Sequence, residues 1–191
     1  MKKLILSLMF YFIFIIGFSQ ESSSNDENQS NSKSIFDRKN EVRLGAIKML
    51  SATIFEATYE RIINNNAGYG SSLLINLNQS NQYLEDFSIT PFFRMYFQTF
   101  EDYGAKGFFV EGFSSFFVGK NYDYVYYSGV EYGREEHETF FDTSIGLAIG
   151  KKWINTSGFV FEIKAGAGRN LLDTSDIPVL FKGDFYIGYR F

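Results

Sequence analysis

The chain has 191 residues, enough for one domain with a leader segment, and 22 acidic against 18 basic residues give a formal net charge of −4. The absence of cysteine excludes disulfides, thiolate metal sites and a lipidated N-terminal cysteine, and the mildly acidic balance gives no support to nucleic-acid binding. With 23 Phe and 13 Tyr beside 21 % charged residues, the composition indicates two opposed faces, one apolar and one charged.

The first segment has the pattern of a secretory signal peptide. Lys2 and Lys3 precede an apolar run from Leu4 to Phe18, and small and polar residues follow. The run is shorter than the roughly 20 residues that a helix needs to cross a bilayer. We predict a signal peptide over residues 1–19, cleaved after Ser19; the alternative is an uncleaved membrane anchor.

The next segment, residues 20–40, is rich in Ser, Asn, Asp and Glu and has one apolar pair, Ile35-Phe36. Such a composition cannot bury enough apolar surface to offset the entropy lost on ordering. It predicts a disordered periplasmic linker, with a binding tail as the alternative.

From Glu41 onward the hydrophobic pattern has a period close to two, without sustained helical spacing. Several of the alternating stretches reach the roughly 9–11 residues with which a tilted strand crosses a bilayer, whereas strands of soluble sheets are usually shorter. The eight predicted strands are 41–49, 53–63, 68–78, 86–100, 106–119, 139–154, 158–170 and 181–191.

The connections between these strands alternate in length. Short, turn-forming segments (64–67, 101–105 and 155–157) alternate with longer polar ones (79–85, 120–138 and 171–180), and only the short connection at 50–52 breaks the rule. Periplasmic turns and long external loops are typical of outer-membrane barrels. The pattern predicts an all-β fold, an eight-stranded antiparallel up-and-down transmembrane β-barrel over residues 41–191.

The alternation also sorts side chains onto two faces. In the last strand Phe181, Phe185, Ile187, Tyr189 and Phe191 share one face, and Lys182, Asp184 and Arg190 share the other. An eight-stranded interior is narrow, which suits the Gly, Ala and Ser that accompany the charges, while the aromatic face suits lipid and an interfacial girdle. A soluble barrel with the faces exchanged is the alternative.

The face assigned to the interior contains six acids and five bases. Because charges removed from bulk water must be paired, we predict an ion-pair network that plugs the barrel; a charged ion path is the alternative. The predicted inward charges are Glu56, Glu60, Arg94, Glu111, Asp142, Lys152, Glu162, Lys164, Lys182, Asp184 and Arg190.

The stretch from Phe108 to Gly119 does not sort in this way. It has Phe on both faces, with Phe109, Phe113 and Phe117 on the same face as Glu111. Either a β-bulge or a partly aromatic interior would explain this pattern.

The chain ends on an alternating strand with a final Phe191, which is similar to the C-terminal signal that the outer-membrane barrel assembly machinery recognises. Several stretches also resemble a family of uncharacterised Gram-negative outer-membrane β-barrel proteins, a domain of unknown function. The resemblance implies a small eight-stranded barrel in a membrane and supplies no reaction. The stretches are FEATYERIIN (55–64), PFFRMYF (91–97), GFFVEGF (107–113), GLAIGKKW (146–153), GFVFEIKAGAGRNL (158–171) and the closing GYRF.

Candidate chemistry is sparse. The single histidine, His137, lies among Glu135, Glu136 and Glu138, with Ser144 seven residues further on. A lipid-modifying enzyme of the outer membrane could use such a histidine, and a metal site is conceivable, but consecutive acids around a loop histidine are more typical of a solvated surface. We predict no catalytic residues, no metal ligands, no cofactor and no enzyme activity.

Loop 120–138 carries five tyrosines, which supply large contact areas with polar tips. It is either a recognition site for an extracellular protein or glycan, or a β-hairpin that extends past the headgroups. The predicted function is that of a small integral barrel of the bacterial outer membrane, in contact with lipid, with a structural or surface-interaction role. The alternatives are a soluble periplasmic ligand-binding barrel and the enzyme that uses His137.

Overall fold

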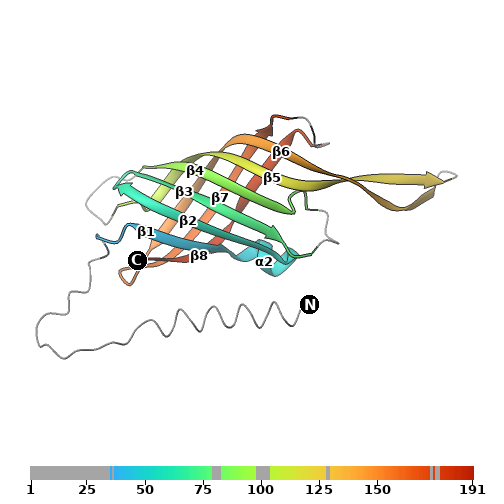
Figure 1. Cartoon of the computed structure of the whole chain (residues 1–191). Helices are drawn as coiled ribbons and strands as arrows, with labels where there is room; N and C mark the ends of the chain where they lie inside the picture. The colour runs from blue at the N-terminus through green and yellow to red at the C-terminus, as the bar shows by residue number, and fades with distance from the viewer. Residues whose placement is uncertain are drawn as a thin grey trace, which may run out of the picture. The chain divides into compact units, whose positions relative to one another are not determined.

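The computed structural model of the chain describes Ile35, Thr174 and residues 37–78, 83–97, 104–127, 130–172 and 177–191, without the side chains of 121–138. Eight strands form one sheet in which each strand pairs antiparallel with its sequence neighbours, and β8 pairs with β1 to close the barrel (Figure 1). The predicted all-β, eight-stranded up-and-down barrel is thus confirmed. The strands are β1 (Asn40–Gly45), β2 (Ile54–Asn64), β3 (Ala67–Asn76), β4 (Phe87–Phe97), β5 (Gly107–Tyr127), β6 (Val130–Ile154), β7 (Phe159–Asn170) and β8 (Val179–Arg190).

The signal peptide predicted over 1–19 and most of the linker predicted over 20–40 lie outside the described residues. The described part of that segment is in contact with the barrel. Ile35 is buried against Ile154 and Val160, and Arg38 donates hydrogen bonds to the Ser157 carbonyl and the Tyr189 hydroxyl.

The two ends of the barrel differ. The turn end, as we call it, carries the start of β1, the final residue Phe191, the β2–β3 and β6–β7 turns and the β4–β5 connection; Asn40 and Phe191 exchange two backbone hydrogen bonds there. The opposite hairpin end carries the β1–β2, β3–β4 and β7–β8 connections and the tip of the β5–β6 hairpin (Figure 1).

The first connection is helical, so the predicted strand over 41–49 is wrong in its second half. β1 ends at Gly45, and the helix α2 (Ala46–Ala52) follows. Its sequence, AIKMLSA, contains good helix formers, and the Asp184 carboxylate of β8 accepts hydrogen bonds from the backbone N–H groups of Ile47 and Lys48. A carboxylate from a distant strand therefore favours the helix, which local alternation cannot reveal.

The predicted loop 120–138 is largely a continuation of two strands. Pairing between β5 and β6 continues past Lys120–Thr139 to Tyr127–Val130, with register shifts on the way. In Figure 1 this ribbon projects well beyond the rest of the barrel. The described backbone of this segment therefore forms the extended hairpin, one of the two alternatives.

Among the residues that the structure describes, no helix combines the length and the apolar character needed to cross a bilayer.

Candidate functional site in the barrel interior

Charged side chains fill much of the barrel interior. All eleven side chains that alternation assigned to the inner face are buried. Three further charges are buried with them: Glu41, Arg43 and Glu85. The first two follow the same alternation in β1 and could have been found from it. Glu85 precedes β4 in a connection, where no periodic pattern exists.

Arg94 of β4 lies at the centre of the larger network. Its Nη1 and Nη2 donate to the two carboxylate oxygens of Glu162, at 2.7 and 2.9 Å, and Nη1 also contacts Glu60 Oε2 at 3.1 Å. Its Nε donates to Glu111. One guanidinium therefore joins β4 to β2, β5 and β7. Its contact with Glu162 is bidentate, the geometry that makes arginine–carboxylate pairs strong.

Glu41 is a second centre in the same network. Its carboxylate accepts from Lys152 Nζ at 2.6 Å and from Arg190 Nε at 2.9 Å. Arg43 Nη1 lies 2.7 Å from both Glu60 Oε2 and Glu162 Oε2, which bind Arg94, and 3.3 Å from Glu41 Oε1, so it joins the two centres. β3 contributes space instead of charge, since a Cβ atom at Gly68 would stand 2.5 Å from Glu60 Oε1.

A smaller cluster lies nearer the hairpin end. Lys182 Nζ binds Glu85, while Glu56 accepts from Lys48 Nζ at 2.6 Å and from the Tyr186 hydroxyl at 2.9 Å. Burial lowers the pKa of Lys48, but Glu56, Tyr83 and Glu85 together raise it more, so this pKa lies above its ordinary value. The lysine of α2 is therefore held in its charged form against the barrel.

The turn end of the interior is closed by backbone and apolar groups. The Arg190 guanidinium donates to the carbonyls of Gly104 and Ala105, both at 2.8 Å. Ala105 is fully buried with Ile62, Tyr96 and Phe109. The described end of the β4–β5 connection, Gly104 and Ala105, thus lies against the interior at this opening.

The hairpin end is closed in a similar way. Phe117, Phe140 and Leu180 form a buried cluster against which Leu84 packs, and the two phenyl rings meet edge to face at 6.0 Å between centroids. Apolar layers at both ends thus enclose the charged interior, which strengthens its ion pairs because it keeps water away.

The two-faced phenylalanine pattern of β5 results from an aromatic interior. Pairing with β4 and β6 keeps one register from Gly107 to Lys120, so there is no bulge in this described stretch. Phe109 and Phe113 stand opposite Gly150 and Gly146 of β6, where a Cβ would come within 2.4 Å of the ring. Glycine on one strand therefore provides the space for each ring from the next.

The outer face is apolar over most of its height. Leu147 and Ile149 are 67 % and 66 % exposed, Phe181 is 73 % exposed, and the neighbouring outward positions carry Phe, Ile and Leu. In the described strands the outward charged side chains are all basic: Arg61, Lys120, Lys151 and Arg169. Arg61, Lys151 and Arg169 lie towards the ends of their strands, and Lys120 lies two residues beyond the last β5 residue that pairs with β4. An uncharged belt therefore remains between them.

His137 and Ser144 do not form a site that the structure supports. Both belong to β6, where seven residues separate them, a distance of roughly 20 Å along the strand. The His137 side chain lies outside the described atoms, and the Ser144 hydroxyl is buried in the interior. Among the described residues, no three His, Asp or Glu side chains are grouped as they would be to hold a metal ion.

These features define a class: a closed, eight-stranded antiparallel barrel with an ionic interior and an apolar exterior. No family model matches the chain, and no curated protein matches it. Among solved structures the chain is similar to the N-terminal β-barrel domain of OprF from Pseudomonas aeruginosa, with 12 % sequence identity and a TM-score of 0.53. The match covers 81 % of this chain and 98 % of that domain, and at this identity it supports the fold alone.

Proposed function

We propose that the chain is a small integral barrel of the bacterial outer membrane with a structural or surface-interaction role, and that its interior does not conduct. The observation that carries this proposal is the inverted polarity of the barrel wall. The exposed outer belt is aromatic and aliphatic, whereas fourteen inward charges are buried. Lipid is the solvent in which such an exterior is stable, because an apolar surface of this size in water would drive association.

The same polarity argues against the soluble ligand-binding barrel. That barrel would need a polar exterior and an apolar interior cavity. Here the interior is occupied by Arg94, Glu162 and their partners, with apolar layers at each end. A closed interior of this kind also favours structural ion pairs over an ion path.

The orientation in the membrane follows from the chain ends. An even number of strands places Asn40 and Phe191 at the turn end, which we assign to the periplasm, together with the linker proposed for residues 20–40 after cleavage of the signal peptide proposed for residues 1–19. We further propose that β8, which closes the barrel against β1, is the strand recognised by the assembly machinery. Membership of the uncharacterised outer-membrane family is part of the proposal.

A surface-interaction role is favoured by the β5–β6 hairpin. Among the described residues its outer part, from Tyr122–Glu136 to Tyr127–Val130, pairs only within the hairpin, since the pairing of β5 with β4 stops at Val118 and that of β6 with β7 begins at Ser144. Both edges of this ribbon are therefore available to an extracellular protein or glycan. No reaction is proposed for it.

The test is fractionation of cells that express the full chain. We expect the protein in the outer-membrane fraction, resistant to carbonate extraction, with faster gel mobility before heating than after. In planar bilayers the purified protein should give no steady unitary conductance. A mature chain that is monomeric in water without detergent would contradict the proposal, and conductance would contradict the closed interior.

A further inference from the structure

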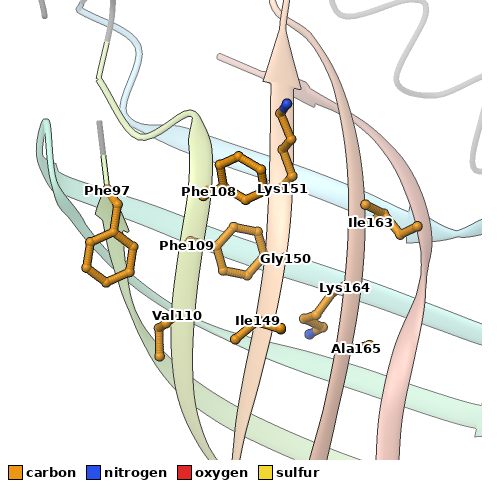
Figure 2. Close-up of a pocket in the computed structure, with 10 residues that line it drawn as sticks. All are labelled: Phe97, Phe108, Phe109, Val110, Ile149, Gly150, Lys151, Ile163, Lys164 and Ala165. Atoms are coloured by element: carbon orange, nitrogen blue, oxygen red, sulfur yellow. The ribbon is translucent and has the colours of Figure 1, made fainter. Parts of the chain in front are cut away.

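The outer wall has a groove near the turn end that the barrel itself does not require. It has a volume of about 430 Å³ and opens outward, and its walls come from β4, β5, β6 and β7. Figure 2 shows Phe97, Phe108 and Val110 on one side, Ile163 and Ala165 on the other, and Ile149 between them. Its lining is apolar except for two lysines: Lys151, which is half-buried on the outer face, and Lys164, whose ammonium group is paired with Glu111 inside the barrel.

Lys151 occupies an unusual position for a charged residue. It faces outward from β6, between Ile149 and Trp153, and its Nζ lies 4.7 Å from the Phe108 ring centroid and 5.2 Å from that of Trp153. In Figure 2 its side chain extends along β6 towards the arrowhead, which is the turn end of the strand. At these distances the two rings attract the ammonium group through cation–π contacts.

No described carboxylate forms an ion pair with Lys151. The ion pairs of the described residues belong to the interior and to α2, and the described outward strand positions carry no Asp or Glu. In a chain of net negative charge, this leaves a cation beside an apolar groove with no anion among the described side chains to bind it. The complementary ligand is one with a negative group joined to a long apolar chain.

The depth of the site agrees with such a ligand. Lys151 is three residues before the end of β6 at Ile154, which corresponds to roughly 8 Å along the axis of a tilted strand. A lysine can reach from this depth to the headgroup level while its methylene groups remain among apolar neighbours. Trp153 and Tyr189, also outward near this end, have the side chains that favour the membrane interface.

We propose that this groove binds one glycerophospholipid, with the phosphate on the ammonium group of Lys151 and an acyl chain along Phe97, Val110 and Ile149. The inference rests on the proposed membrane location, and it places the lipid in the periplasmic leaflet. It differs from general lipid contact because it assigns one site with a fixed headgroup contact.

The experiment is native mass spectrometry of the full barrel, purified in detergent and titrated with phosphatidylglycerol, phosphatidylethanolamine, diacylglycerol with the same chains, or inorganic phosphate. We expect one phospholipid per chain, with diacylglycerol bound more weakly. Lys151→Gln should lower phospholipid affinity about five-fold, as expected for one cation at a headgroup. The control is Arg61→Gln. Arg61 is a cation of β2 that also lies near the turn end, but it is hydrogen-bonded to Asn40 and is not part of the groove.

A second pair of variants tests the groove itself. Ala165→Trp should fill it and lower phospholipid affinity, whereas Ala167→Trp, two residues along the same outward face of β7, should not. Equal losses in Lys151→Gln and Arg61→Gln would overturn the site. So would binding of inorganic phosphate alone with the same dependence on Lys151, or a dimer that Ala165→Trp dissociates, since the groove would then hold a second copy.

Failure of the site and failure of the proposed function give different results. If the wild type inserts into vesicles and shows heat-modifiable mobility while Lys151→Gln binds lipid unchanged, the site is wrong and the membrane barrel stands. If the wild type does not insert, the proposed function fails first.

Discussion

The inner and outer faces of the barrel are built from the same strands, yet they form two different kinds of surface. In β6, Asp142 and Lys152 point into a charged interior, while Leu147 and Ile149 point outward and are exposed. Buried charges are costly unless each has a partner, and exposed apolar groups are costly only in water. The inner face is therefore stabilised by specific pairs and the outer face by its solvent, so the two faces should respond differently to substitution.

The largest effect should follow from the loss of Arg94. Arg94→Met leaves Glu60, Glu111 and Glu162 with one cation fewer in a dry interior. We expect the free energy of unfolding to fall by about 3–5 kcal/mol, measured by urea unfolding in vesicles. Met95→Leu, which changes the adjacent outward side chain, is the control and should have little effect. A similar small loss in both variants would mean that the network does not stabilise the barrel.

A charge on the outer face should be nearly as damaging, but only at mid-height. Leu147→Arg, at the middle of the β6 wall, should cost about 2–4 kcal/mol in vesicles, and Phe159→Arg, at the start of β7, about 0–1 kcal/mol. Urea unfolding of the two variants in the same vesicles measures the difference. In a soluble barrel both positions would be solvated surface, so equal and small effects would place the outer face in water.

Adding one methyl group to a glycine should affect the stability of the barrel differently on the inner and outer faces. At Gly146 a Cβ would stand 2.4 Å from the Phe113 ring, whereas at Gly112 on the outer face its nearest neighbour is Leu147 Cδ2 at 3.9 Å. Gly146→Ala should therefore lose about 1–3 kcal/mol of stability, and Gly112→Ala should lose none. The temperature at which the heat-modifiable gel band shifts gives a simple comparison, and an unchanged Gly146→Ala would contradict the packed aromatic interior.

The smallest effect should follow from the replacement of Lys48 in α2. Its folded-state pKa is raised above the ordinary value of about 10.4, so the Lys48–Glu56 pair contributes its stability below that pH and loses it as the pH rises through the folded-state pKa. We expect Lys48→Met to cost about 1 kcal/mol at pH 8. The difference from wild type should decrease only in strong alkali.

Tyr83 titrates in the same alkaline range, because burial and the neighbouring Glu85 raise its pKa. The comparison with wild type should therefore be repeated in a Tyr83→Phe background, with unfolding followed at each pH. A difference that already disappears near neutral pH would show that Lys48 is not held charged by Glu56.

Much of the barrel could be predicted because strand alternation is a local property. A period of two assigns each side chain to a face, and it placed all eleven predicted charges correctly in the buried set. It could not predict α2, because the Asp184 carboxylate that supports the helix comes from the last strand. Nor could it decide whether Phe109 and Phe113 indicate a bulge, because the answer depends on glycines in the neighbouring strand.

The sequence by itself determined the strand number and the two faces, since both depend on the order of residues within single strands. Only the tertiary structure decided which charges meet and what closes each end. Arg94 meets Glu60 and Glu162 across 34 and 68 residues of chain, and Arg190 meets the carbonyl of Gly104 across 86. Such contacts depend on strand register and barrel closure, which bring distant residues to the same level and which no local pattern specifies.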